Sequence, residues 1–420
     1  GPLDVARVQR LHIEFLFSSK RFDEAIDFGL EALSILGQEF LSNPDMAFAT
    51  AKLSELLERL EREPPDYFSM PRLYDQDPEL LAVTEIMWPV GNAAFISRPA
   101  LAPLIYIRCV ELSLERQLLP ESIPSIIAAV GMYANALLGK IEVAHKYGET
   151  AIELASRATL HTNLYAVLQV HALYNYFWRK PLRETLDLFD RAIQSAHDYG
   201  NYEFVSYVSL SWSKHAFYVS MELAQVEERC LRLRTFIDAI HYVTQSRWVN
   251  IYVTAVQAIR GSSSAQGITW RGTPFDDEQD LPDLQRVEDQ LGLLYVYCAK
   301  AWVATLFGDH DGVEEYSDLS LSFLVAAPSG IEKAILTFIC GLRCARELRK
   351  NPCESEIEQD LEEHLGSLEG FAGLAPMNFA HKLSLVQAEV HRARGEVLPA
   401  MKAYEQASQG ARENGYLSEA

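Results

Sequence analysis

The stretch ARGEVLPAMKAYEQAS, residues 393–408, contains the pattern that decides the fold. A turn residue, Gly395, precedes an apolar anchor at Val397, and small residues follow at Ala400 and Ala407. These intervals of three and seven residues place the anchor and both alanines on one face of a helix. Small side chains on that face let a neighbouring helix approach closely, so the pattern predicts a helix–turn–helix hairpin.

The same spacing recurs along the chain. Its other copies are Phe22, Ala25 and Ala32; Pro99, Ala102 and Cys109; Ile141, Ala144 and Ala151; Leu182, Thr185 and Ala192; Leu223, Val226 and Leu233; and His310, Val313 and Ser320. Successive anchors lie 77, 42, 41, 41, 87 and 87 residues apart, so a repeat of about 41 to 44 residues fits if degenerate copies fill the wide gaps. Alternating strand-like runs are scarce. The sequence therefore predicts an all-α, tetratricopeptide-like superhelix of about nine to ten helical hairpins.

Residues 1–3 and three interruptions bound the predicted domain. We expect residues 1–3 to be the remnant of tag cleavage, and residues 4–420 to form a single α-helical repeat domain. The helical pattern breaks near 63–78, 261–285 and 372–378. The longest break is rich in Gly, Ser and acidic residues, and loops of that length are usually functional or mobile. The alternative is that each break is a plain connector between repeats.

The composition argues against several classes of partner. The 420 residues include 58 acidic and 37 basic side chains, which gives a formal net charge of −21. This balance opposes nucleic-acid backbones and anionic membrane surfaces, because both attract clustered Lys and Arg. No apolar run reaches the ~20 residues of a membrane span, and we expect no secretory leader. The six cysteines are sparse and form no CxxC pair, so we predict a reduced, cytoplasmic protein without nucleic-acid or membrane partners.

A family resemblance rests on four stretches of the chain. They are PLIYIRCVELSLERQLLPESIPSIIAAVGMYANALLGKIEVAHKYGETAIEL (103–154), YNYFWRKPLRETLDLFDRAIQSAHDYGNYEFVSY (174–207), PFDDEQDLPDL (274–284) and APMNFAHKLSLVQAEVHRARGEVLPAMKAYEQAS (375–408). Together they resemble the helical-repeat region of large multidomain signalling kinases of cyanobacteria, other bacteria and fungi. The resemblance covers nearly all of residues 10–420, although the opening repeat and residues 310–370 match loosely.

The resemblance implies a place for this chain among other modules. In that family a Ser/Thr-kinase-like module and a predicted AAA or STAND-type ATPase come first, and a GAF domain and usually a histidine-kinase module follow. The chain would then be the regulatory or interaction region between the ATPase and the downstream modules. The catalytic motifs of the family belong to the neighbouring modules, so the resemblance implies none here.

Catalytic patterns are missing from the sequence itself. It contains no GxxxxGK[ST] phosphate loop, GxGxxG fingerprint, HRD or DFG motif, GxSxG elbow or HExxH pair. The run FGDHDGVEEYSD, 307–318, has Phe307 and Asp318 where a calcium loop needs its first and last carboxylates, so it indicates a charged helix–helix turn. The histidines do not cluster along the sequence. We therefore predict a chain that is not an enzyme, with no catalytic residues, no metal site and no cofactor.

Aromatic residues suggest a binding surface. In tetratricopeptide hairpins the first helix lines the concave face at set offsets before the anchor. These offsets select Tyr133, Tyr174, Phe177, Trp178, His215, Tyr218 and Trp302, with Lys214 as a basic neighbour. Residues 165–252 also hold 17 of the 44 aromatic residues of the chain. Aromatic side chains often anchor partners or ligands, but they also fill the gaps between long helices, and both interpretations stay open.

Three functions are compatible with these observations. The leading hypothesis is a non-catalytic regulatory superhelix that binds protein modules of the same polypeptide or other signalling proteins. The first alternative is the sensor domain of a STAND-type ATPase, with a small-molecule metabolite bound in the aromatic groove. The second alternative is a stand-alone tetratricopeptide scaffold that joins separate proteins. An enzyme is the least favoured, because catalysis needs positioned acid, base or nucleophilic groups.

Overall fold

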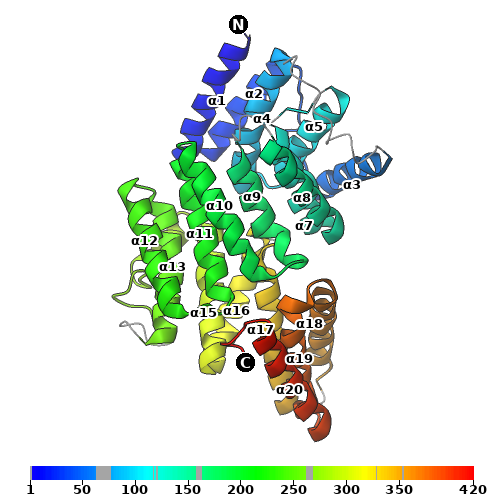
Figure 1. Cartoon of the computed structure of the whole chain (residues 1–420), viewed down its shortest axis with the longest axis vertical. Helices are drawn as coiled ribbons and strands as arrows, with labels where there is room; N and C mark the ends of the chain where they lie inside the picture. The colour runs from blue at the N-terminus through cyan, green and yellow to red at the C-terminus, as the bar shows by residue number, and fades with distance from the viewer. Residues whose placement is uncertain are drawn as a thin grey trace. The chain divides into compact units, whose positions relative to one another are not determined.

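The computed structural model describes residues 2–62, 77–116, 118–119, 122–157, 163–261, 268–327, 329–351 and 354–420. The chain divides into two compact units, Gly1–Asn175 (unit 1) and Tyr176–Ala420 (unit 2). The single repeat domain expected over residues 4–420 stays a prediction. Figure 1 shows helices throughout both units.

Unit 1 is built from α-helices and one π-helical segment. They are α1 (Pro2–Ser18), α2 (Phe22–Ile35), α3 (Met46–Arg62), α4 (Pro78–Ser97), α5 (Ala102–Glu115), α6 (Ile123–Ile126), the π-helical segment η3 (Ile127–Tyr133), α7 (Ala134–Leu138), α8 (Ile141–Arg157) and α9 (Leu164–Tyr174). Helices α1 and α2 both pack on α4, and α8 packs between η3 and α9. The interior of unit 1 is mainly aliphatic.

Unit 2 begins with two 3₁₀ turns, η4 (Tyr176–Trp178) and η5 (Leu182–Glu184). Its helices are α10 (Thr185–Asp198), α11 (Tyr202–Tyr218), α12 (Leu223–Ala239), α13 (Val243–Arg260), α14 (Asp280–Arg286), α15 (Gln290–Phe307), α16 (His310–Ser322), α17 (Ile331–Lys350), α18 (Ser355–Leu374), α19 (Pro376–Ala393) and α20 (Val397–Glu413), with η6 (Leu324–Ala326) before α17. Helices α18, α19 and α20 lie side by side (Figure 1), and α11, α13, α15 and α17 pack in succession.

The predicted repeat anchors lie at helix starts. Phe22, Ile141, Leu223, His310 and Val397 are the first residues of α2, α8, α12, α16 and α20. Leu182 begins η5, which leads into α10, and Pro99 lies just ahead of α5. No strand occurs among the described residues. The predicted all-α, tetratricopeptide-like fold is therefore confirmed for the part of the chain that the structure describes.

The small residues of the repeat are buried, as close helix packing requires. The buried ones are Ala25, Ala32, Ala102, Cys109, Ala144, Ala151, Thr185, Ala192, Val226, Val313, Ser320, Ala400 and Ala407. Leu233, the largest side chain predicted at these positions, is only half-buried. A small side chain lets two helix axes approach and bury more of their flanking apolar atoms.

Helix ends explain the turns between repeats. Gly139 ends α7 with a φ of 62° and Gly308 ends α15 with a φ of 67°, values that glycine adopts without steric strain. Asp309 then caps α16, because its Oδ1 accepts a hydrogen bond from the Gly312 N–H at 3.1 Å. The run 307–318 is thus a helix–helix turn, as predicted, and Asp309 acts in it as a helix cap.

The first predicted break lies mostly outside the described residues, and the third is shorter than predicted. Residues 63–76 lie outside the described part of the chain, and α4 begins at Pro78 with Asp77 as its cap. The break expected over 372–378 is much shorter, because α18 continues to Leu374 and α19 begins at Pro376. Proline suits the first turn of a helix, since its missing N–H would have no partner within the helix there.

The second predicted break packs against unit 2 where it is described, and it is shorter than expected, because α14 begins at Asp280. Residues 262–267 lie outside the described part, but Trp270 and Phe275 are fully buried. Lys300 on α15 donates to the Ile268 carbonyl at 2.8 Å and to an Asp277 oxygen at 2.7 Å. Residues 268–285 therefore pack onto the helices of unit 2.

Two helices are long and apolar enough to cross a membrane by length and composition. They are α4 and α15, and 67% and 72% of their apolar windows are buried inside the structure. This corrects the expectation that no apolar run is long enough. Core helices with two buried faces have the same composition.

Candidate functional site

All eight predicted binding residues lie in the interior. Tyr133, Tyr174, Phe177, Trp178, Lys214, His215, Tyr218 and Trp302 each have an exposed fraction of 8% or less. The first two belong to unit 1 and the other six to unit 2. The structure corrects the expectation that they line an open aromatic groove. It supports the alternative, in which aromatic side chains fill the gaps between long helices.

In unit 1, Tyr133 and Tyr174 pack near η3. The rings of Tyr133 and Tyr106 lie 6.3 Å apart between centroids. Burial raises the pKa of the Tyr133 hydroxyl. Asn135 Nδ2 donates to the Tyr174 carbonyl at 3.0 Å, which ties α7 to the end of α9. Both tyrosines thus contribute to the packing of unit 1.

In unit 2, Phe177 and Trp178 hold η4 against α17–α19. Trp178 Nε1 donates to the Ser329 carbonyl at 3.1 Å, and its ring lies 4.9 Å from the Phe371 ring. Asn378 Nδ2 donates to the Phe177 carbonyl at 2.7 Å, and Asn378 Oδ1 accepts from the Leu182 N–H at 2.9 Å. The two Asn378 bonds join segments 196 and 201 residues apart in sequence, so this cluster organises the unit.

His215 is fully buried between aromatic rings. Its Nδ1 lies 2.9 Å from Thr185 Oγ1, and its ring makes an edge contact with Phe189 at 5.0 Å. Burial and the adjacent Lys214 charge lower the pKa of the imidazole well below 6.5. His215 is therefore neutral near pH 7 and acts as a packed hydrogen-bonding group.

Lys214 forms a buried ion pair with Glu332. Lys214 Nζ lies 2.7 Å from Glu332 Oε1, and their side chains are 2% and 0% exposed. The ammonium group also lies 4.8 Å from the centre of the Tyr295 ring. The pair links α11 to α17 in the centre of unit 2. Burial of two charges is tolerated because each offsets the other and the ring quadrupole adds attraction.

Tyr218 and Trp302 lie in the same interior region. Their ring centroids are 5.9 Å apart in an edge-to-face arrangement, which the ring quadrupoles favour. Tyr218 Oη donates to Cys298 Sγ at 3.3 Å, and burial is the main cause that raises the pKa of this thiol to about 12. Trp302 also contacts Phe338 on α17. A raised thiol pKa suppresses nucleophilic reactivity, so Cys298 packs as a small apolar residue.

A second buried ion pair joins Lys382 to Glu419. Lys382 Nζ lies 2.6 Å from Glu419 Oε1, and His381 Nε2 lies 3.0 Å from Glu419 Oε2. The Tyr416 ring lies 4.5 Å from the Lys382 ammonium group. Burial tends to raise the pKa of Glu419, but Lys382 and His381 hold it below its ordinary value. This pair fixes the last turn of the chain against α19.

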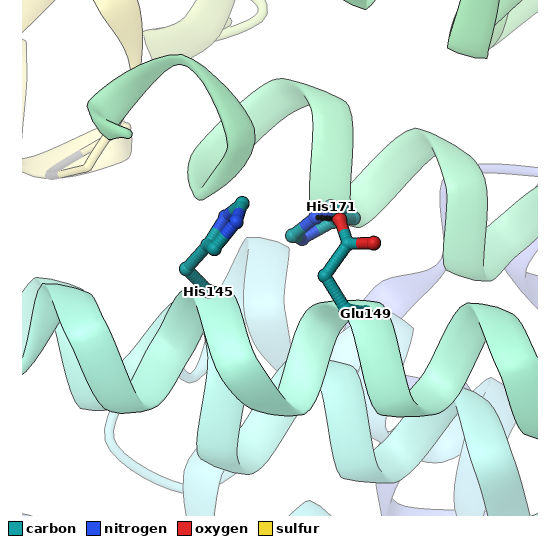
Figure 2. Close-up of side chains that lie close together, drawn as sticks. All are labelled: His145, Glu149 and His171. Atoms are coloured by element: carbon teal, nitrogen blue, oxygen red, sulfur yellow. Dashed lines mark hydrogen bonds and ion pairs between the residues drawn. The ribbon is translucent and has the colours of Figure 1, made fainter. Parts of the chain in front are cut away.

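A cluster of metal-ligating groups occurs in unit 1, where the sequence analysis predicted none. His145 and Glu149 lie on α8, and His171 lies on α9. Figure 2 shows the three side chains pointing into the space between the two helices. One ligand atom from each lies within 4.8 Å of the others. The sequence signal was the His-x₃-Glu spacing on the predicted helix, since residues four apart share a face.

An exposed apolar row runs along α1. Val5, Val8, Leu11 and Phe15 have exposed fractions of 57 to 67%. The opposite side of α1 buries Ala6, Ile13 and Leu16 against unit 1. We call these four exposed residues the α1 apolar row. An apolar row at helical spacing on an exposed helix face is a candidate interaction site.

Comparisons with known proteins do not identify a family or a function for this chain. No family model matches the chain, and no curated protein matches its sequence. Among solved structures, the chain is similar to a Rap protein crystallised in complex with Competence and Sporulation Factor. The identity is 11%, the TM-score is 0.35, and the match covers 99% of each chain. The functional interpretation therefore rests on the residues themselves.

Proposed function

We propose that this chain is a non-catalytic protein-interaction domain that binds a partner helix through the α1 apolar row. The observation that carries the proposal is the exposure of Val5, Val8, Leu11 and Phe15 on an outer helix. Because these side chains are 57 to 67% exposed, each would gain roughly 1–2 kcal/mol if a partner buried it fully. A surface of this kind favours association over solvation.

The spacing of the row defines the partner. Residues three to four positions apart form a straight ridge on a helix, which fits the groove of a second helix. Unit 1 buries its own helices in this way, because α4 packs against α1, α2 and α5. Charged side chains of both signs flank the row, including Arg7, Arg10 and Glu14, and Arg10 pairs with Glu14 at 3.4 Å. The partner is therefore an amphipathic helix with an apolar stripe and a mixed-charge border.

We further propose that the partner belongs to the same polypeptide or signalling assembly. Support comes from the resemblance of four stretches to the helical-repeat region of multidomain signalling kinases. In that setting the chain would relay contacts between an ATPase module and downstream kinase modules. The coding sequence on either side of this region tests the proposal. Absence of ATPase and kinase modules there would restrict the function to a scaffold for separate proteins.

The binding surface is tested by titration of single variants. The probe is each module encoded beside this region, purified separately and added to the full chain in a calorimeter. Leu11→Asp should weaken binding at least about tenfold, because it places a charge within the ridge. The matched control is Leu398→Asp, a substitution of an apolar residue on α20 that is 72% exposed, against 59% for Leu11. Equal weakening by both variants, or binding unchanged in Leu11→Asp, would contradict the proposed surface.

The metabolite-sensor alternative depended on an open aromatic groove. Its predicted residues are buried and hold helices together, so no specific observation now favours that function. The interaction function is the one that the described surface supports best.

A further inference from the structure

We propose that His145, Glu149 and His171 bind a divalent transition-metal ion of the zinc class between α8 and α9. This site is independent of the α1 apolar row and would add a metal-responsive clamp to unit 1. Two imidazoles and one carboxylate converge there from adjacent helices (Figure 2). Such a ligand set recurs in three-ligand zinc sites, where water or another donor completes the coordination.

The chemistry of the donors selects the class of ion. Imidazole nitrogen suits Zn²⁺, Ni²⁺, Co²⁺ and Cu²⁺, whereas Mg²⁺ and Ca²⁺ prefer oxygen ligands throughout. Two of the three donors here are nitrogen, and none is a thiolate. The ligand set therefore favours zinc-class ions over the hard cations.

The position of His171 is set by the packing of α8 and α9. The His171 side chain is fully buried, and its Nε2 lies 2.9 Å from Glu149 Oε1. Gly148 makes this possible, because a Cβ at residue 148 would lie 2.0 Å from His171 Nδ1. The ring is therefore held against the backbone of α8, with Nε2 directed toward Glu149. A fixed buried ligand is the element that a metal site needs first.

The other two ligands can adjust. Tetrahedral zinc, with metal–nitrogen bonds of about 2.0–2.1 Å, keeps its ligands roughly 3.3–3.4 Å apart. The ligand atoms of the cluster now lie within 4.8 Å of one another, and the two imidazole ring centroids are 5.3 Å apart. The Glu149 side chain is 53% exposed and His145 is half-buried, so a rotation of these two side chains would close the site around the buried His171. The exposed side leaves access for the ion and for a fourth ligand.

Binding would couple α8 to α9 more strongly. The ion would be held by two ligands from α8 and one from α9, and so would tie the two helices together. Because only the folded chain brings His145, Glu149 and His171 together, metal binding adds to the stability of unit 1. The same coupling makes the site measurable by thermal unfolding as well as by binding.

The experiment titrates Zn²⁺ alone into the full chain after removal of metal with a chelator. We expect one saturable site per chain and a higher unfolding temperature with Zn²⁺. The test variant is His145→Gln combined with Glu149→Gln, which keeps the buried His171 and so preserves the fold. It should bind Zn²⁺ at least about tenfold more weakly, since losing a ligand costs no less than losing an outer-shell partner. Circular dichroism checks that the double variant is helical.

Two controls decide between this site and general metal binding. His197→Gln removes an exposed histidine of unit 2 and should leave Zn²⁺ affinity unchanged. Co²⁺ should give a visible d–d absorption band in the wild type that the double variant lacks, and Ca²⁺ should not compete. The proposal is overturned if the double variant binds Zn²⁺ as well as the wild type. Ca²⁺ competition at equal concentration, or the absence of saturable Zn²⁺ binding below the millimolar range, would overturn it too.

Discussion

The interiors of the two units are built from different side chains. In unit 1 the buried positions are mainly Leu, Ile, Val and Ala, with four buried tyrosines. Among the described residues, every buried Phe and Trp belongs to unit 2, and so do the three buried lysines, Lys214, Lys300 and Lys382. Each of these lysines has a carboxylate within 2.7 Å and an aromatic ring within 4.8 Å.

The two interiors show that a high density of aromatic residues has more than one structural explanation in helical repeats. Large rings fill wide gaps between long helices, and lysine stems cover apolar surface while their ammonium groups find carboxylates. A high aromatic density therefore indicates a widely spaced interior as readily as a binding groove. In unit 1, small residues allow closer contacts, as Gly148 does beneath His171.

The largest expected effect comes from the buried charges of unit 2. Lys214→Met should lower the free energy of unfolding by about 3–5 kcal/mol, because it leaves Glu332 charged and buried without its partner. The double variant Lys214→Met, Glu332→Leu should recover most of this loss. Urea unfolding of the full chain measures both. The control is Arg157→Met, which breaks an exposed pair with Glu153 in unit 1 and should change stability little. If Lys214→Met and Arg157→Met lower the free energy of unfolding equally, the buried ion pair of unit 2 is no more important for stability than the exposed pair of unit 1.

A pair of glycine substitutions tests close packing. Gly148→Ala should lower the free energy of unfolding by about 1–3 kcal/mol, because the new methyl group collides with the His171 ring. Gly370→Ala, in α18 with open space around it, should raise stability by roughly 0.5–1 kcal/mol through better helix propensity. Thermal unfolding of both variants gives the signs. Stabilisation by Gly148→Ala would show that His171 does not pack against α8.

Mild acid should weaken unit 2. The pKa values of His215, His364 and His381 are all lowered, with burial as the first cause. The unfolded chain then takes up these protons at higher pH than the folded chain does. Stability is therefore at its full value above pH 6.5 and declines as pH falls from there toward the folded-state pKa values. Each such histidine contributes a slope of up to about 1.4 kcal/mol per pH unit.

Amide hydrogen exchange can follow this acid effect locally. Protection in α11 and α19 should fall between pH 7.5 and pH 5.5, after correction for the intrinsic exchange rate. His215→Gln, which does not titrate, should flatten the change in α11. Protection in α11 that stays constant over this pH range would show that His215 titrates in the folded state as it does in water.

The sequence alone predicted where several helices begin and which of their small residues are buried. Helix periodicity and the anchor pattern predicted the starts of α2, α8, α12, α16 and α20, because these depend on residues within one hairpin. The burial of Ala144 and Ala400 followed from the same spacing. These features are set by short-range contacts.

The surroundings of the candidate site residues depend on segments that are distant in sequence. The repeat pattern does not indicate which of those segments pack together. Trp302 is buried against Phe338 of α17, a helix within residues 310–370, where the family resemblance is loose. Trp178 is covered by Phe371 and Phe379, which lie about 200 residues away in sequence. His145 meets His171 only because two neighbouring helices pack in one register. A residue's offset within its hairpin does not determine which other helix covers it.

The most direct test of the interaction surface is a hydrogen-exchange footprint of the full chain with and without its neighbouring module. Binding through the α1 apolar row should slow exchange in α1, residues 2–18, and leave α11 and α13 unchanged. Slower exchange confined to α11 and α13, with α1 unaffected, would contradict the proposed surface. It would indicate that the partner binds at the aromatic residues of unit 2 instead.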